Sequence, residues 1–280
     1  MKDKMITASR IDAFKQYLRE QEKSSMTVEK YLRDVRTFAR EIRGRAPTCE
    51  DVFSYKGRLR ERYTVAAANS MLAALNAFFR FCDWPELCVR QFKVQRQAFC
   101  PAEKELTKEE YRRLVRCAAE RKNERLALIL QTVCGTGIRV GELSCITVEA
   151  VRRGKATVAC KGKTRTVFLI PALQKKLQRY IARRRIASGA VFVTASGRPI
   201  DRCNVWKEMK ALSVQAGVAP EKVFPHNLRH LFARTFYAME KDIAKLADIL
   251  GHSSINTTRI YIITTGEEHR RRMEHMHLIL

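Results

Sequence analysis

The chain has 280 residues, which suits one large or two modest domains, and its 46% hydrophobic content is enough to build packed cores. Its 54 lysine and arginine residues exceed 29 acidic residues and give a net charge of +25, which favours a polyanionic partner, first of all nucleic acid. No run approaches the roughly 18 apolar residues of a membrane span, no apolar segment follows the first charged residues as in a secretory signal, and the basic residues are too widely spread for a membrane-surface helix.

The first 92 residues predict a small all-helical domain. Apolar residues recur at helical spacing in four segments, over about 6–22, 28–38, 51–62 and 65–82. Thr27 is a suitable N-cap for the second segment, and Thr48 with Asp51 resembles a capping box before the third. Periodicity is lost from about Gln91 to Leu106, and we assign 93–106 to a linker.

A second domain is predicted over 107–280, because Thr107 and Glu110 form a capping box after the linker. An apolar helix follows and stops at Gly135-Thr136-Gly137. This turn places Arg139 in the first turn of a further helix, with Glu142 three residues on and on the same face. We expect Glu142 to orient the Arg139 guanidinium, although a plain surface ion pair would have the same spacing.

Two strands are predicted over 156–160 and 165–170, around a turn that carries Lys161 and Lys163. A lysine at a hairpin tip can enter a nucleic-acid groove, and it can equally serve only for solubility.

The remaining segments predict further helices and one short strand, over 190–193. Asp201 caps a helix through Leu212, and this helix could enter a DNA major groove through Arg202 and Lys207, although surface exposure explains these residues equally well. Pro225 is expected to open a further helix.

Five polar side chains occur in an order that suits one reaction. They are Arg139, His226, Arg229, His252 and Tyr261. Two guanidiniums can clamp the non-bridging oxygens of a phosphate, a phenol beside cations can become a nucleophile, and imidazoles transfer protons near neutral pH. Each residue alone has an ordinary explanation as a surface, capping or core residue. Together they favour phosphoryl transfer on a diester without a metal.

The motifs that hold these residues are Thr136–Leu143, His226-Asn227-Leu228-Arg229-His230, Leu250-Gly251-His252 and Thr258-Arg259-Ile260-Tyr261. In this order the chain resembles a tyrosine recombinase of the phage-integrase family, close to its Xer and mobile-element integrase branches. The resemblance implies a mainly α fold with a small antiparallel β-sheet. It implies a four-helix, SAM-like core-binding domain over 1–92 and an α+β catalytic domain with a C-terminal tail over 107–280.

By this resemblance Tyr261 attacks a DNA phosphodiester and forms a 3′-phosphotyrosyl intermediate, without metal or ATP. Arg139 and Arg229 clamp the phosphate, His226 is the proton acceptor or shuttle, and His252 donates a hydrogen bond to the phosphate. The catalytic lysine that protonates the leaving 5′-oxygen is assigned to Lys161, with Lys163 as the alternative.

The partners implied are double-stranded DNA with an inverted-repeat core site and three further copies of the chain in a tetramer. The C-terminal tail would dock on a neighbouring subunit or fold back on its own. DNA contacts are expected at Lys23, Ser25, Thr27, Lys163, Arg202 and Lys207.

Two other activities remain open: a catalytically silent DNA-binding regulator, and a type IB topoisomerase. Integration, excision, inversion and resolution are equally open as the biological task.

The nine cysteines are scattered and form no C-x-x-C pair, so neither a zinc site nor a redox motif is supported. We expect no metal and no cofactor, and we expect reduced, mostly buried cysteines in a cytoplasmic protein.

Overall fold

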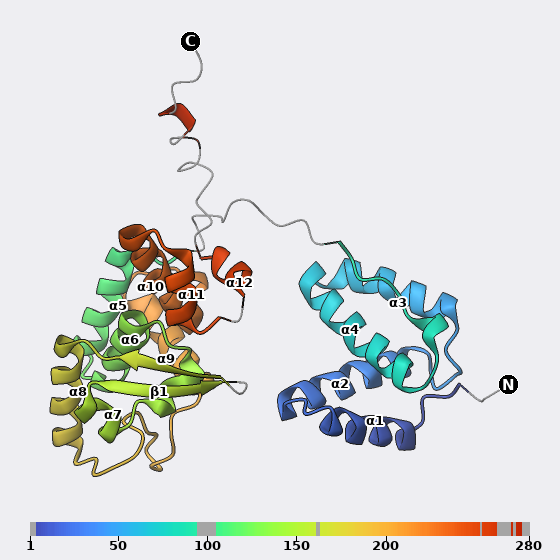
Figure 1. Cartoon of the computed structure of the whole chain (residues 1–280), viewed down its shortest axis with the longest axis horizontal. Helices are drawn as coiled ribbons and strands as arrows, with labels where there is room; N and C mark the ends of the chain where they lie inside the picture. Colours follow the sequence, from blue (N-terminus) through green and yellow to red (C-terminus); the bar gives the residue numbers. More distant parts are fainter. Residues whose placement is uncertain are drawn as a thin grey trace. The chain divides into compact units, whose positions relative to one another are not determined.

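The computed structural model of the protein (Figure 1) describes residues 4–93, 105–160, 163–252, 254–261, 270 and 273–275, without the side chains of 160 and 163. The chain divides into two compact units, Met1–Arg96 and Gln97–Leu280. Most of the predicted linker and most of the segment after Tyr261 lie outside the described residues. Among the residues described, no helix is both long and apolar enough to span a membrane.

The first unit contains the four predicted helices. They are α1 (Ala8–Glu20), α2 (Ser25–Glu41), α3 (Cys49–Arg62) and α4 (Val65–Phe81), followed by the short 3-10 helix η1 (Pro85–Leu87). Their apolar faces meet in an aromatic core, in which Phe14, Phe38 and Phe78 are fully buried. The Thr48–Asp51 capping box forms as expected.

The start of α2 differs from the prediction. The N-cap is Ser24, whose side-chain oxygen accepts a hydrogen bond from the Thr27 amide, so the helix begins at Ser25. Thr27 therefore lies inside the first turn and is not the cap. The sequence offers hydroxyl side chains at both positions, and only the three-residue reach from Ser24 to the Thr27 amide satisfies an unpaired N–H of the first turn.

The second unit is mainly helical with one two-stranded antiparallel sheet, which confirms the predicted fold class. Its elements are α5 (Lys108–Glu120), α6 (Glu124–Thr136), η3 (Val140–Cys145), α7 (Val148–Arg153), β1 (Lys155–Cys160), β2 (Lys163–Phe168), α8 (Pro171–Arg184), α9 (Arg202–Gln215), η4 (Pro220–Lys222), α10 (Pro225–Glu240), α11 (Ile243–Leu250) and α12 (Ile255–Arg259). The predicted caps at Thr107 and Asp201 are present, and Pro225 is the first residue of α10, as predicted.

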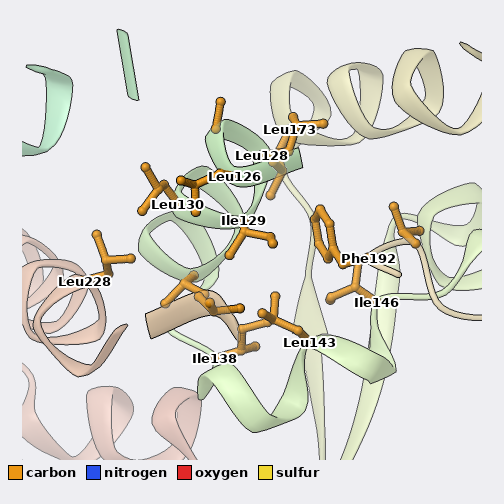
Figure 2. Close-up of a cluster of buried hydrophobic side chains, with 14 of the residues drawn as sticks. Leu126, Leu128, Ile129, Leu130, Ile138, Leu143, Ile146, Leu173, Phe192 and Leu228 are labelled. Atoms are coloured by element: carbon orange, nitrogen blue, oxygen red, sulfur yellow. The ribbon is translucent and has the colours of Figure 1, made fainter. Parts of the chain in front are cut away.

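Helix α6 is the centre of this unit. Four consecutive residues, Leu126, Ala127, Leu128 and Ile129, are buried along with most of the helix, which is expected of a helix that is apolar on all sides. Figure 2 shows its leucines facing side chains from several other segments, including Ile146, Phe192 and Leu228. The centrally packed α6 therefore provides a rigid base for the polar turn at its C-terminal end.

The hairpin β1–β2 pairs Cys160 with Lys163, and the two residues between them lie outside the described residues. The second strand thus begins two residues earlier than predicted and ends at Phe168. Its early end follows from Ile170, which is already the N-cap of α8. The predicted strand over 190–193 is reduced to two isolated bridges, Thr147 with Ala190 and Val193 with Pro199.

Candidate active site

The turn after α6 requires glycine at position 137. Gly137 adopts a left-handed φ of 67°, and a Cβ there would lie 2.5 Å from the Phe232 ring, so a side chain would be both strained and blocked. Arg139 follows in extended conformation as the N-cap of η3, not in the first turn of an α-helix as predicted. The Gly137 turn thus brings Arg139 close to α10.

Glu142 holds Arg139 at two points. Its carboxylate accepts hydrogen bonds from the Arg139 amide at 2.8 Å and from Arg139 Nη1 at 3.0 Å. It also accepts two bonds from Arg165 of β2, at 3.1 and 2.7 Å. Burial alone would raise the pKa of Glu142, but the hydrogen bonds from Arg165 and Arg139 outweigh it and hold the pKa below its ordinary value.

Arg229 lies at the centre of the site and is 1% exposed. Its Nη1 donates to the Gly137 carbonyl at 2.6 Å, and its Nη2 donates to the Leu250 carbonyl at 2.7 Å and approaches His252 Nε2 at 2.9 Å. Its buried Nε has no partner among the described residues. Burial lowers the pKa of the guanidinium, and a hydrogen bond with Tyr261 acts in the opposite direction.

His252 is positioned by the turn after α11. Gly251, with a φ of 66°, ends the helix, and the next residue places its imidazole between Arg229 and Thr258, whose Oγ1 lies 2.8 Å from His252 Nδ1. Burial and the charges of Arg229 and Arg139 lower the pKa of His252 to about 4. The ring is therefore neutral at pH 7.

Tyr261 is 2% exposed and is surrounded by three imidazoles. Its hydroxyl lies 3.4 Å from His226 Nε2, its ring lies edge-on to His230 with 4.4 Å between ring centroids, and it stacks on His252 at 5.6 Å. Although His226 is exposed, partial burial and the nearby charges of Arg229 and Arg139 lower its pKa. Burial, His226 and Arg229 lower the pKa of His230 to about 4.

A cleft of about 990 Å³ lies beside these groups. Arg139, Glu142, His226 and Arg229 line one part of it. Helix α9 contributes Arg202, Cys203, Trp206 and Lys207 to the lining. The two residues predicted to enter a major groove thus lie in the same cleft as the predicted catalytic groups.

A smaller pocket, of about 310 Å³, lies on the first unit. It is lined by two of the predicted DNA contacts, Lys23 and Ser25, together with Lys15, Arg19 and Arg36. Thr27 is not part of its lining, and its hydroxyl instead lies 2.9 Å from that of Ser24. The pocket is basic, with Glu29 as its one acidic lining residue.

The side chains of the two predicted lysines are not described by the structure. Lys161 lies outside the described residues, and Lys163 is described only by its backbone, as the first residue of β2. In the described part of the chain, no cluster of three or more histidine, cysteine or carboxylate side chains is arranged to hold a metal ion.

Two residues of the site were missed by the sequence analysis. Arg165 alternates with Val167 and Leu169, both buried, and a charged residue on the buried face of a strand requires a partner. His230 lies four residues after His226 and therefore on the same helical face. Both signals were present in the sequence.

The comparisons with known proteins agree with this geometry. Residues 104–268 match the phage integrase family, and residues 11–85 match the phage integrase N-terminal SAM-like domain. The chain is 29% identical to tyrosine recombinase XerA of Pyrococcus furiosus, over 100% of this chain and 98% of the relative. It is 31% identical to tyrosine recombinase XerA of Thermococcus kodakarensis, over 96% of this chain and 95% of the relative.

Solved structures share the fold. A crystal structure of XerA recombinase is 25% identical, with a TM-score of 0.54, over 97% of this chain and 99% of that chain. A lambda integrase tetramer bound to a Holliday junction is 17% identical, with a TM-score of 0.74, over 93% of this chain and 78% of that chain. The chain belongs to the phage integrase family of tyrosine recombinases.

Proposed function

We propose that this site-specific recombinase cuts and rejoins DNA through a 3′-phosphotyrosyl intermediate on Tyr261, without metal or ATP. The observation that carries the proposal is the position of the Tyr261 hydroxyl, 3.4 Å from His226 Nε2 and near enough to Arg229 to act on the pKa of that guanidinium. A phenol in contact with a neutral imidazole and a guanidinium has both a proton acceptor and a charge that stabilises the phenolate. All of these groups come from one chain.

In the first step, the Tyr261 oxygen attacks the phosphorus and the bond from phosphorus to the 5′-oxygen breaks. His226 takes the phenol proton, which its lowered pKa allows because the ring is neutral at pH 7. Lys161, with Lys163 as the alternative, supplies the proton that the leaving 5′-oxygen needs. Each proton transfer contributes on the order of 10²–10⁴-fold.

Arg139 and Arg229 would stabilise the charge that builds on the non-bridging oxygens. Both line the cleft, and the buried Nε of Arg229 has no hydrogen-bond partner among the described residues. Guanidiniums held by hydrogen bonds to the protein can stabilise this charge, which is the role that a metal ion has in other phosphoryl transfers. The phosphotyrosine keeps the energy of the broken bond, so that attack by a 5′-hydroxyl can rejoin the strand without ATP.

The proposed substrate is duplex DNA with an inverted-repeat core site, bound by a homotetramer. The net charge of +25 and the basic linings of the cleft and of the pocket on the first unit support a DNA partner. The similar lambda integrase structure is a tetramer on a Holliday junction, and a XerH recombinase of the same fold was crystallised on its difH substrate. Because the proposed substrate is DNA, we still predict that the protein is cytoplasmic. Docking of the C-terminal tail on a neighbouring subunit also stays a prediction.

The direct test mixes the purified protein with a nicked duplex carrying a candidate inverted-repeat site, in EDTA and without ATP. The nick lets the cut end diffuse away, so a covalent intermediate accumulates as an adduct that resists SDS. An adduct under these conditions is the expected result. Tight binding to the same DNA without any adduct would instead favour the regulator hypothesis.

A further inference from the structure

We infer that Arg165 is a positioning residue for the reaction, which fixes Arg139 through Glu142 and connects three separate parts of the site. The inference rests on the proposed function, because its effect is on the rate at which Tyr261 attacks the phosphate. Arg165 need not contact DNA in this role. It acts through the carboxylate that holds the phosphate-binding arginine.

The contact between Arg165 and Glu142 is bidentate. Arg165 Nη1 lies 3.1 Å from Oε1 and Nη2 lies 2.7 Å from Oε2, so both carboxylate oxygens are held in the plane of the guanidinium. The side chains are 11% and 9% exposed. An ion pair of this kind is little screened by solvent, and its geometry is better defined than that of a surface pair.

The position of the Arg139 guanidinium depends on the Glu142 carboxylate. The Arg139 side chain is 37% exposed, and its one hydrogen bond to the described part of the protein runs from Nη1 to the same Oε1 atom. The orientation of the Glu142 carboxylate therefore decides where this partly exposed guanidinium lies. Without Arg165, the carboxylate keeps its contacts with Arg139 alone and is free to turn with it.

Arg165 also contacts the turn that carries His252. A Cβ added at Gly251 would lie 2.8 Å from Arg165 Cδ, so the arginine side chain crosses directly over this turn. The charge of Arg165 contributes to the lowered pKa of His252. Arg165 on β2 pairs with Val158 on β1, and Lys161, proposed as the general acid, directly follows β1 in the sequence. One side chain thus joins the Arg139 loop, the lysine hairpin and the Gly251–His252 turn.

The second unit offers a matched comparison. Arg125 also pairs with a glutamate between distant segments, with 2.7 Å between its Nη2 and Glu208 Oε1, and its partly buried side chain is 26% exposed. It lies in the first turn of α6, at the opposite end of the helix from Arg139. Replacing it removes a similar ion pair without touching the phosphate-binding arginines.

The experiment compares Arg165→Gln, Arg165→Lys, Glu142→Gln, the double variant Arg165→Gln with Glu142→Gln, and the control Arg125→Gln, all in the full chain. Three quantities are measured: the rate of covalent adduct formation at saturating nicked DNA, the Kd for that DNA, and the Tm. Loss of a group that orients a catalytic residue typically costs about 10–100-fold.

We expect Arg165→Gln to slow adduct formation by about 10–100-fold at saturating DNA, with a Kd within about 2-fold of wild type. Arg165→Lys keeps the charge but cannot span both oxygens, so an intermediate rate is expected. The double variant is expected to be no slower than the slower single variant, because both changes remove the same constraint. Arg125→Gln should lower the Tm and keep the wild-type rate.

A wild-type adduct rate in a folded Arg165→Gln variant would overturn the inference and leave the proposed function intact. If that variant does not fold, Arg165→Lys decides in its place, and a wild-type rate there would have the same meaning. Fully additive rate losses in the double variant would also overturn it. Failure of the wild-type protein to form a Tyr261-dependent adduct would instead overturn the proposed function, and the inference with it.

Discussion

Arg229 Nη2 lies 2.9 Å from His252 Nε2, and this contact fixes the tautomer of the histidine. A guanidinium only donates, so Nε2 accepts, and the ring proton lies on Nδ1, from which it is donated to Thr258 Oγ1 at 2.8 Å. In this arrangement His252 cannot donate from Nε2 to a phosphate. The proposed role of His252 therefore requires that Arg229 turn its Nη2 toward the phosphate when DNA binds, or that the ring gain a proton.

Thr258→Val tests this network. Thr258 is fully buried, and valine keeps its shape but removes the hydroxyl that accepts the Nδ1 proton. The unpaired N–H should cost about 1–3 kcal/mol of unfolding free energy, and we expect adduct formation to slow by about 10-fold because the ring loses its orientation. Thr258→Ser keeps the hydroxyl and should retain most of the rate. Equal rates for the valine and serine variants would show that the contact has no part in the reaction.

Gly137→Ala should lower the rate of adduct formation as well as the free energy of unfolding. The positive φ of Gly137 and the 2.5 Å between an added Cβ and the Phe232 ring make alanine costly, by about 1–3 kcal/mol. The backbone must move to relieve this clash, and the movement displaces the Gly137 carbonyl that anchors Arg229. Gly57→Ala is the control, because Gly57 lies inside α3 with nothing within 4 Å of an added Cβ. It should stabilise the protein by roughly 0.5–1 kcal/mol. Urea denaturation and adduct rates give both quantities, and a Gly137→Ala protein with wild-type rate would contradict the account.

The stability of the protein should fall as the pH drops from about 6.5 to about 4. The pKa values of His230 and His252 are lowered to about 4, below the roughly 6.5 of an unfolded histidine, so the unfolded chain binds more protons in this window. Each such imidazole adds up to about 1.4 kcal/mol per pH unit to the slope, and above pH 6.5 its contribution is complete. Calorimetry of wild type and His230→Gln checks this, since the variant should lose stability less steeply. Parallel slopes would count against the buried, neutral state of His230.

The choice between Lys161 and Lys163 can be made with a chemically altered substrate. Replacing the bridging 5′-oxygen by sulfur gives a leaving group that needs no proton, because thiols have pKa values near ~8.5. Loss of the general acid should slow cutting of normal DNA by about 10²–10⁴-fold and leave cutting of the sulfur substrate nearly unchanged. We expect this pattern for Lys161→Ala and not for Lys163→Ala. The reverse pattern would move the assignment to Lys163.

Local signals in the sequence were sufficient for the helices and most of their caps. The Thr107–Glu110 capping box and the start of α10 at Pro225 each depend on residues within one helical turn. The α2 cap was assigned wrongly because Ser24 and Thr27 are both good caps, and hydrophobic spacing cannot choose between them. The ordered motifs were sufficient for the family.

Contacts between distant segments could not be predicted. The anchor of Arg229 on the Gly137 carbonyl joins residues 92 positions apart, and the tautomer of His252 depends on that same arginine. The pairing of Arg165 with Glu142 crosses 23 positions. Strand alternation could have marked Arg165 as buried, but only the folded chain shows which carboxylate it holds.

The central claim is that Tyr261 is the nucleophile, and mass spectrometry of the covalent adduct tests it most directly. The adduct formed on a nicked duplex in EDTA is digested, and the peptide that carries the nucleotide is identified. We predict a single phosphotyrosine at Tyr261 and no adduct from Tyr261→Phe, which should bind the DNA as tightly as the wild type. An adduct on another residue, or one that persists in Tyr261→Phe, would contradict the account.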